Sequence, residues 1–182
     1  NGRQGERVTE LMRAWMADPR QCDYHGLQNF DGLVAQAVRC WKESGEVLVR
    51  MRRPSAATMR RLGLTIPLQL QVMEGDWIDE SQDTVGTETG SGFTKRGIVY
   101  DEEGRRERFW IYNYHPGEGA VQVVSQVSNT VPAEEIIHLF TPERPGMSRG
   151  VSCLSPGMVR LKDLGDLLDA RLMSQKIAAC MS

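Results

Sequence analysis

The chain has 182 residues, of which 40% are hydrophobic, and a formal net charge of −2, which suits one domain with a hydrophobic core but predicts no basic surface for gripping nucleic acid. Its four cysteines form no Cys-x-x-Cys pair, so a reducing, intracellular environment is favoured over a disulfide framework. No apolar run approaches the roughly 20 residues of a membrane-spanning helix, and the polar start NGRQGERVTE does not resemble a signal peptide.

Two amphipathic helices are predicted at the beginning of the chain. Over residues 8–16 the apolar side chains recur at steps of three and four, until Asp18-Pro19 ends the pattern. A second pattern of this kind covers residues 27–41, and Gly45 follows where a helix is expected to end. We expect the aromatic residues of this second helix to pack in the core.

Two strands follow the helices. Residues 46–52 and 68–72 alternate apolar with polar side chains, which predicts half-buried strands. Residues 54–63, between them, form a basic stretch that we interpret as a solvated loop, with contact to phosphates as the alternative.

Acidic residues gather around Trp77. They are Glu74, Asp76, Asp79 and Glu80. Because their spacing lacks the D-x-[DN]-x-[DN]-G pattern of a calcium loop, we predict a helix cap and exposed charges rather than a metal site. The polar segment 81–97 comes next, and we expect it to be mobile. Its Lys95 is followed by Arg96, so the Gly-Lys-Ser/Thr pattern of a phosphate-binding loop is missing.

A β-hairpin is predicted over residues 98–114, because two strand-like runs flank a short turn that contains Gly104. Basic and aromatic side chains share one face of its second strand; they are Arg108, Trp110, Tyr112 and Tyr114. We interpret this face as packing in the core or against another subunit, and stacking on single-stranded nucleic acid is the alternative. One more strand is predicted over residues 121–127.

The last third of the chain carries the most distinctive pattern. A short apolar run around His138 predicts a buried strand in which His138 points away from its apolar neighbours. Prolines and glycines then break regular structure over residues 142–150. Ser155-Pro156 marks the start of a long helix. One apolar stripe is predicted along this helix, and it consists of Met158, Leu161, Leu164, Leu168 and Leu172.

The segment IIHLF…ERPGMSRGVSCLSPGMVRLKDLGDLLDARLMSQKIAA resembles the signature region of lambda-like phage portal proteins. In that family a strand ending in His-x-Phe leads to an Arg-Pro-Gly turn, then to Arg-Gly-Val and a long helix with Leu-x-Asp-Leu and Asp-Ala. The matching positions are His138, Phe140, Arg144, Pro145, Gly146, Arg149, Gly150, Val151, Leu161, Asp163, Leu164, Asp169 and Ala170. GEVLVR and GIVYDEEGRRERFWIYNYHPGEG match more weakly but in the family's order, and Met147 stands where the family commonly has Gln.

Taken together, the patterns predict an α+β fold with N-terminal helices, a mostly antiparallel sheet of short strands and a long C-terminal helix. The resemblance implies that residues 1–154 form a wing-like domain and that residues 155–182 begin a stem. It also implies a structural, non-enzymatic subunit of a ring, typically of twelve copies, at the capsid vertex through which DNA is packaged and ejected. Because the chain lacks an initiator Met and its last helix has no stop signal, we expect an internal piece of a longer protein.

The resemblance further implies which partners to expect. They are copies of the chain, capsid and scaffolding proteins, the packaging motor (terminase), a head–tail adaptor, and double-stranded DNA that passes through without sequence-specific contact. We expect no cofactor, metal or membrane, and a location in the virion after assembly in the host cytoplasm. Family-motif or subunit-contact candidates are His138, Phe140, Arg144, Pro145, Gly146, Arg149, Gly150, Leu161, Asp163, Leu164 and Leu168. Arg144 and Arg149 are expected to bind carboxylates of an adjacent element or subunit.

A thiol-type hydrolase built on Cys153 and His138 is the alternative from another class. Such a pair needs a thiolate within hydrogen-bond reach of the imidazole. Cys153 lies among apolar residues and is predicted to be a small buried thiol, and we expect no pocket to join it to His138. The three histidines are widely separated, so a zinc site is not predicted either.

Overall fold

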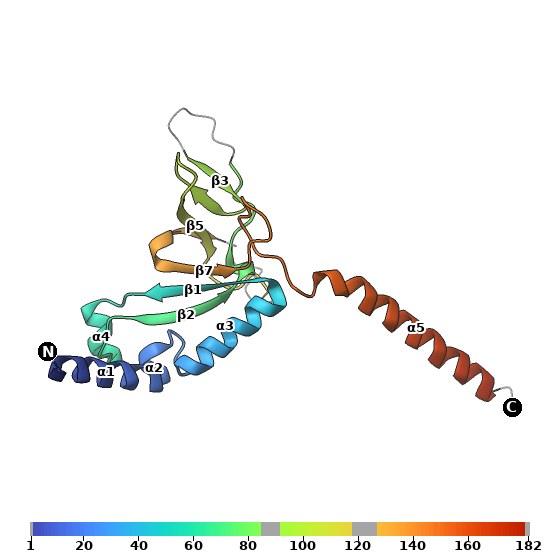
Figure 1. The fold of residues 1–182 in the computed structure, drawn as a ribbon, viewed down its shortest axis with the longest axis horizontal. Coiled ribbons are helices and arrows are strands. Elements are labelled where there is room, and N and C mark those ends of the chain that lie inside the picture. The colour runs from blue at the N-terminus through green and yellow to red at the C-terminus, as the bar shows by residue number, and fades with distance from the viewer. Residues whose placement is uncertain (1, 85–91, 118–126, 181–182) are drawn as a thin grey trace.

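The computed structural model describes residues 2–84, 92–117 and 127–180 (Figure 1). Its helices and strands form two antiparallel sheets with helices at the beginning and a long helix near the end. The predicted α+β fold is confirmed, although the strands are divided between two sheets rather than gathered in one. All but the last residue of the strand predicted over 121–127 lies outside the described residues.

Three helices open the chain: α1 (Gly2–Ala17), α2 (Pro19–Cys22) and α3 (Phe30–Ser44). The side chain of Asn29 caps α3 by accepting a hydrogen bond of 3.0 Å from the backbone N–H of its third residue. Gly45 ends α3 with φ at +87°, a left-handed conformation that glycine adopts without strain. Both predicted helices and the terminating glycine are confirmed.

The first sheet has the strand order β2-β1-β7, formed by β1 (Glu46–Arg52), β2 (Gln69–Glu74) and β7 (Ile136–Phe140). Both pairings are antiparallel, and β1, the central strand, places Leu48 opposite His138. Helix α3 lies along β1 and β2 and leaves β7 uncovered on that face (Figure 1).

The basic stretch after β1 was predicted to be a loop, and that prediction is wrong. It forms the short helix α4 (Ala56–Leu62), whose N-terminus is capped by Ser55 and which Gly63 ends with φ at +67°. The side-chain oxygen of Ser55 accepts from the N–H of Thr58 at 3.3 Å. Ser55 and Gly63 are ordinary signals for the start and the end of a helix. The stretch was nevertheless predicted to be a loop because it is basic.

The second sheet has the order β3-β4-β5-β6. Its strands are β3 (Phe93–Lys95), β4 (Ile98–Tyr100), β5 (Arg106–Tyr112) and β6 (Ser128–Pro132). Strands β4 and β5 are the predicted hairpin, which is confirmed. Strand β3 lies inside the segment expected to be mobile, so that expectation fails for these three residues. Two short 3-10 helices, η1 (Gly75–Trp77) and η2 (Ala133–Glu135), follow β2 and precede β7.

The main core lies where the two sheets meet. Leu48 of β1, Ile98 of β4 and Phe109 of β5 are at most 1% exposed, and Met73 and Ile136 from the first sheet join them. Alternation along β5 buries Phe109 and Ile111 and leaves Trp110 and Tyr112 half-buried on the other face, as the pattern predicted. Burying each such side chain contributes about 1.5–3 kcal/mol.

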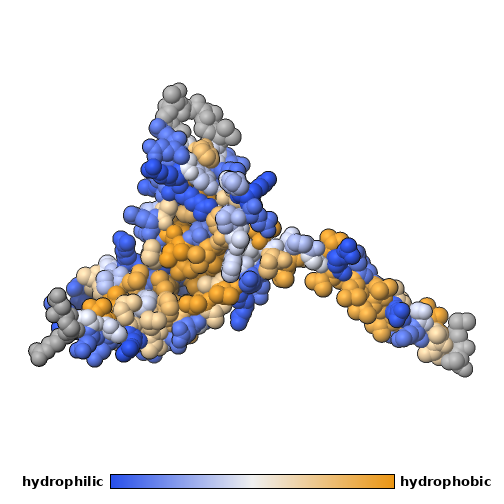
Figure 2. Space-filling model, in the orientation of Figure 1, coloured by the Kyte–Doolittle hydropathy of each residue, from blue (hydrophilic) through white to orange (hydrophobic). Residues whose placement is uncertain are grey.

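Helix α5 (Ser155–Cys180) projects away from both sheets (Figure 1). Every residue from Met158 to Cys180 is exposed, and Figure 2 shows apolar surface along much of its length. None of the helices in the described ranges has the length and hydropathy that a bilayer crossing requires.

Candidate functional site

The loop between β7 and α5 is held to the first sheet by one buried side chain, that of Arg149. Its guanidinium Nε donates to Oε1 of Glu46 at 2.8 Å, and Nη2 donates to the carbonyl of Gly75 at 2.9 Å. Nη1 lies 2.8 Å from Oε1 of Glu80 as an ion pair. The Arg149 and Glu46 side chains are only 4% and 6% exposed, so this is an interior ion pair that joins segments 103 residues apart.

His138 completes the environment of the same carboxylate. Its Nε2 lies 2.8 Å from Oε2 of Glu46, and its Nδ1 lies 2.9 Å from Nη1 of Arg106. Because an arginine can only donate, Nδ1 accepts and Nε2 carries the proton that His138 donates to Glu46. Burial lowers the pKa of His138, with the positive charges of Arg106 and Arg149 acting in the same direction against the opposing effect of Glu46. The ring is therefore neutral and fixed in one tautomer.

Glu46 is the centre of this cluster, which we call the hinge cluster and define as Glu46, Arg106, His138, Arg149 and Gly150. Burial opposes ionisation of Glu46, but hydrogen bonds from His138, Arg149 and the N–H of Gly150, with the Arg149 charge, outweigh it. They lower the pKa of Glu46 to about 2. The carboxylate is thus ionised and fully partnered at neutral pH.

Glycines let the loop approach β1 closely. A Cβ on Gly150 would meet the carbonyl of Gly45, and a Cβ on Gly45 would meet the backbone of Val151. A Cβ on Gly75 would meet the Glu46 side chain. These three positions need a hydrogen in place of a side chain, because the hinge cluster holds the two backbones in contact.

The remaining motif residues divide into contacting and exposed ones. The half-buried Phe140 ring lies against His138, with centroids 4.7 Å apart, and the Arg106 guanidinium lies 5.1 Å from the Phe140 ring centre. Arg144, Pro145 and Gly146 are exposed on the turn. Arg149 meets carboxylates as expected. Arg144 meets none in the described part of the chain, so its contact with another subunit stays a prediction. The helix candidates Leu161, Asp163, Leu164 and Leu168 are all exposed on α5.

The structure separates the two groups of the hydrolase alternative. His138 is buried with both ring nitrogens engaged, whereas the Cys153 thiol is exposed and donates to the carbonyl of Lys42 at 3.3 Å. The prediction of a buried Cys153 is wrong, because the loop carrying it lies on the surface beside the end of α3. With different partners and different burial, the two residues do not form a nucleophile and base.

Two side chains of the aromatic face of β5 make hydrogen bonds within the chain. The Tyr112 hydroxyl donates to Asp79 at 2.7 Å, and Arg108 donates to the hydroxyl of Thr130 at 3.1 Å. Asp79 also accepts from Ser81, Gln82 and Ser128; these hydrogen bonds outweigh burial and lower its pKa to about 2. The expectation of exposed acids around Trp77 therefore fails at Asp79, which is 3% exposed and links η1 to β5 and β6.

One group of possible metal ligands occurs among the described residues, Glu74, Asp76 and His115, with ligand atoms within 4.8 Å of one another. The two acids are exposed and His115 is half-buried. None of these three side chains is buried, so the group lacks the enclosed ligands that would mark a built metal site.

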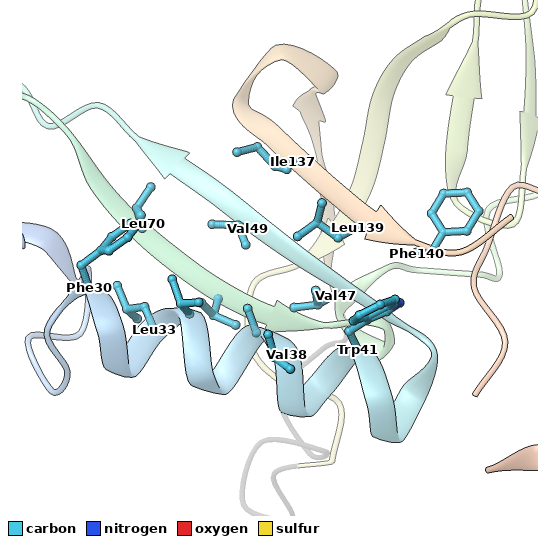
Figure 3. A pocket seen from close by; sticks show the side chains of 13 residues that line it. Phe30, Leu33, Val38, Trp41, Val47, Val49, Leu70, Ile137, Leu139 and Phe140 are labelled. Atoms are coloured by element: carbon cyan, nitrogen blue, oxygen red, sulfur yellow. The ribbon is translucent and has the colours of Figure 1, made fainter. Parts of the chain in front are cut away.

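An apolar groove of about 470 Å³ lies between α3 and the uncovered side of β7 (Figure 3). Phe30, Leu33, Val38 and Trp41 of α3 face strand residues across it, among them Ile137 and Leu139, and neither His138 nor Cys153 lines it. Its lining is almost wholly apolar, so it offers no polar groups to orient a substrate.

Comparison with known proteins decides between these interpretations. The family described as "Phage portal protein, lambda family" matches residues 2–182. The chain belongs to the lambda family of phage portal proteins. The "Probable portal protein" of Halomonas phage phiHAP-1 is 28% identical over 159 residues, which is 87% of this chain. The chain spans 29% of that relative's length, less than a third of it.

In this portal family chain, the sequence motif identifies Arg149, His138 and Gly150 but not Glu46, the residue to which all three donate hydrogen bonds. Glu46 lies inside a predicted half-buried strand, and a charged residue there needs a partner. A charged residue in this strand was thus the one sign in the sequence that Glu46 needs a partner. The sequence did not show that the partners are His138 and Arg149, because they lie 92 and 103 residues away from Glu46 along the chain.

Proposed function

We propose that this chain is a structural part of a portal ring at a capsid vertex, through which DNA is packaged and ejected. The observation that carries the proposal is the family match over residues 2–182. The exposed α5 agrees with it, because a 26-residue helix that buries no side chain against its own chain needs a partner. The proposed role is structural rather than enzymatic.

Mechanically, the hinge cluster sets the direction in which α5 leaves the wing-like part. Arg149 and Gly150 hold the loop to β1, and α5 begins five residues beyond Gly150. Buried charges of this kind are costly to separate, since removing one partner leaves the other unpaired in the interior. The base of the stem-like helix is thus fixed to the sheet while the rest of it extends outward (Figure 1).

The proposed partners follow from this role. Copies of the chain, typically twelve in the family, would form the ring, and capsid and scaffolding proteins, terminase and a head–tail adaptor would contact it. Double-stranded DNA would pass without sequence-specific contact. A net charge of −2 supports this, because a surface that does not neutralise phosphates lets DNA slide.

Electron microscopy of the protein expressed from its complete gene tests the proposal. We expect closed rings with a central channel in negative stain, at more than one salt concentration. A protein that stays monomeric under all these conditions would contradict the ring proposal. Hydrolase activity of the purified protein that Cys153→Ser abolishes would instead support the thiol-hydrolase alternative.

A further inference from the structure

A pocket of about 260 Å³, distinct from the apolar groove, lies between the two sheets near the end of β1. Strands β1 and β2 line one side of it, and β5 and β6 line the other. Core side chains that are at most 3% exposed contribute its apolar part; they are Met73, Ile111 and Val131. Its polar part includes Arg50 and Arg52, and none of the described residues that line it is acidic. We call it the arginine pocket.

The alternation of β1 places both arginines on one face of the strand. Residues two apart in a strand point to the same side, so Arg50 and Arg52 share the face of Leu48. Leu48 is buried in the main core, where the two sheets meet. Toward the end of β1 this face carries guanidinium groups in place of apolar side chains. The strand thus directs two positive charges into the space between the sheets.

Arg50 has a hydrogen-bond donor without a partner. Its Nη2 donates to Oε2 of Glu135 at 3.2 Å, in an ion pair whose side chains are 18% and 32% exposed. Its Nε is buried and has no hydrogen-bond partner among the described residues. A buried N–H without an acceptor costs free energy. This donor therefore marks a place for an acceptor that the chain itself does not supply.

Arg52 lacks a carboxylate altogether. Its Nε donates to Oε1 of Gln71 at 2.9 Å, and its guanidinium carbon lies 4.7 Å from the centre of the Tyr24 ring. These contacts hold the side chain in place, but across residues 2–84, 92–117 and 127–180 Arg52 forms no ion pair. Burial, followed by the positive charge of Arg50, lowers the pKa of Arg52. The two guanidinium groups thus repel each other, and the Glu135 carboxylate offsets only one of them.

An amide group adds neutral donors at the exposed side of the arginine pocket. Nδ2 of Asn129 donates to Oδ1 of Asn113 at 2.8 Å, and both residues are exposed and line the pocket. Each side-chain amide has one oxygen and one N–H2 group, so this bond leaves the N–H2 group of Asn113 unused. The pocket therefore offers charged and neutral donors together.

We propose that the arginine pocket binds a compact oxyanion, a phosphate or a carboxylate group. Guanidinium groups bind such oxygens through charge-assisted hydrogen bonds. The oxyanion accepts from Nε of Arg50, neutralises Arg52 and accepts from the Asn113 amide. Inorganic phosphate and the carboxylate of an acidic side chain both supply this chemistry. The inference is independent of the portal role, because every residue that it uses belongs to one copy of the chain.

Isothermal titration calorimetry of the full-length protein with sodium phosphate or sodium acetate tests the proposal. Sodium chloride keeps the ionic strength constant, so that general screening is the same in every titration. Arg50→Gln with Arg52→Gln removes the positive charges of the pocket. Arg60→Gln with Arg61→Gln is the matched control, because it removes two positive charges from exposed positions of α4.

Asn113→Asp tests the same pocket without changing its arginines. It keeps an oxygen that accepts from Asn129, but it replaces the unused N–H2 group with a second carboxylate oxygen. Because Asn113 is exposed, the melting temperature should stay at the wild-type value. Weaker anion binding by this variant would then be due to the added negative charge and not to misfolding.

We expect the wild type and the matched control to bind one anion per chain with the same affinity. The double arginine variant and Asn113→Asp should bind it at least about tenfold more weakly. Tighter binding of phosphate than of acetate would assign the pocket to free phosphate or a phosphate ester, and the reverse order would assign it to a carboxylate such as an acidic side chain of a partner. Equal affinity of the wild type and the double arginine variant, or no saturable binding of either anion by the wild type, would overturn the inference.

Discussion

The hinge cluster predicts a large loss of stability when Arg149 loses its guanidinium. Arg149→Met keeps much of the side-chain volume but leaves the Glu46 carboxylate with only His138 and Gly150, and leaves the Gly75 carbonyl without its donor. Breaking a buried ion pair from one side costs about 3–5 kcal/mol. A domain of this size is stable by only about 5–15 kcal/mol, so the variant should lose a large fraction of its stability.

Urea unfolding followed by tryptophan fluorescence and circular dichroism measures this loss. Arg144→Met is the matched control, because Arg144 is exposed on the same loop and pairs with no carboxylate in the described part of the chain, so its loss should stay within about 0.5 kcal/mol. In a double-mutant cycle, Glu46→Gln should recover part of the loss caused by Arg149→Met, since it removes the unpaired charge. Equal losses for Arg149→Met and Arg144→Met, or no coupling with Glu46, would refute this reasoning.

Two further predictions concern pH and the close backbone approach. The pKa values of Glu46 and Asp79 are lowered to about 2 from 4.5 and 3.8, so each group stabilises the fold above its unfolded pKa, and that stability is lost as pH falls toward 2. The lowered pKa of His138 causes a further loss of stability that begins at higher pH, as pH falls through 6.5. There His138 takes up a proton in the unfolded chain but stays neutral in the folded chain. The melting temperature should therefore fall gently and then steeply as pH is lowered from 8 to 2.5, and Glu46→Gln should reduce the steep part of this fall. A steep part that stays unchanged in this variant would contradict its assignment to Glu46. Gly150→Ala should destabilise the fold by more than about 1 kcal/mol, because its Cβ would meet the Gly45 carbonyl. Gly157→Ala, at the start of α5, should be neutral or stabilising, because a Cβ there meets no other atom. Equal effects of the two substitutions in urea unfolding would count against the close approach of the two backbones.

Local signals in the sequence were sufficient for most elements. The Gly45 stop, the alternation of β1 and β5 and the turn at Gly104 each depend on residues close together in the chain, so they could be predicted. Helix α4 was missed because its basic charge was given more weight than its Ser and Gly boundaries. The exposure of Cys153 could not be predicted from its apolar neighbours, because it depends on where the loop crosses the end of α3.

The candidate site was predictable in part. The motif identified Arg149, His138 and Gly150, yet their convergence on Glu46 requires β7 and the following loop to return to β1, which is a tertiary event. Further exposed apolar residues of α5, among them Leu167 and Ile177, lie outside the single leucine repeat that was predicted.

Chemical trapping along α5 tests most directly whether this helix stands beside copies of itself. Cysteines placed at the exposed Leu164 and Met173, which lie on opposite sides of α5 at about 100° per residue, would be joined by a short bis-maleimide after the exposed Cys153 and Cys180 have been changed to serine. If each α5 stands between the α5 helices of two other copies in a closed ring, the variant with both cysteines gives a ladder of covalent multimers up to the full ring, and either single cysteine gives monomers. Dimers from a single cysteine, or no ladder from assembled rings, would contradict that arrangement.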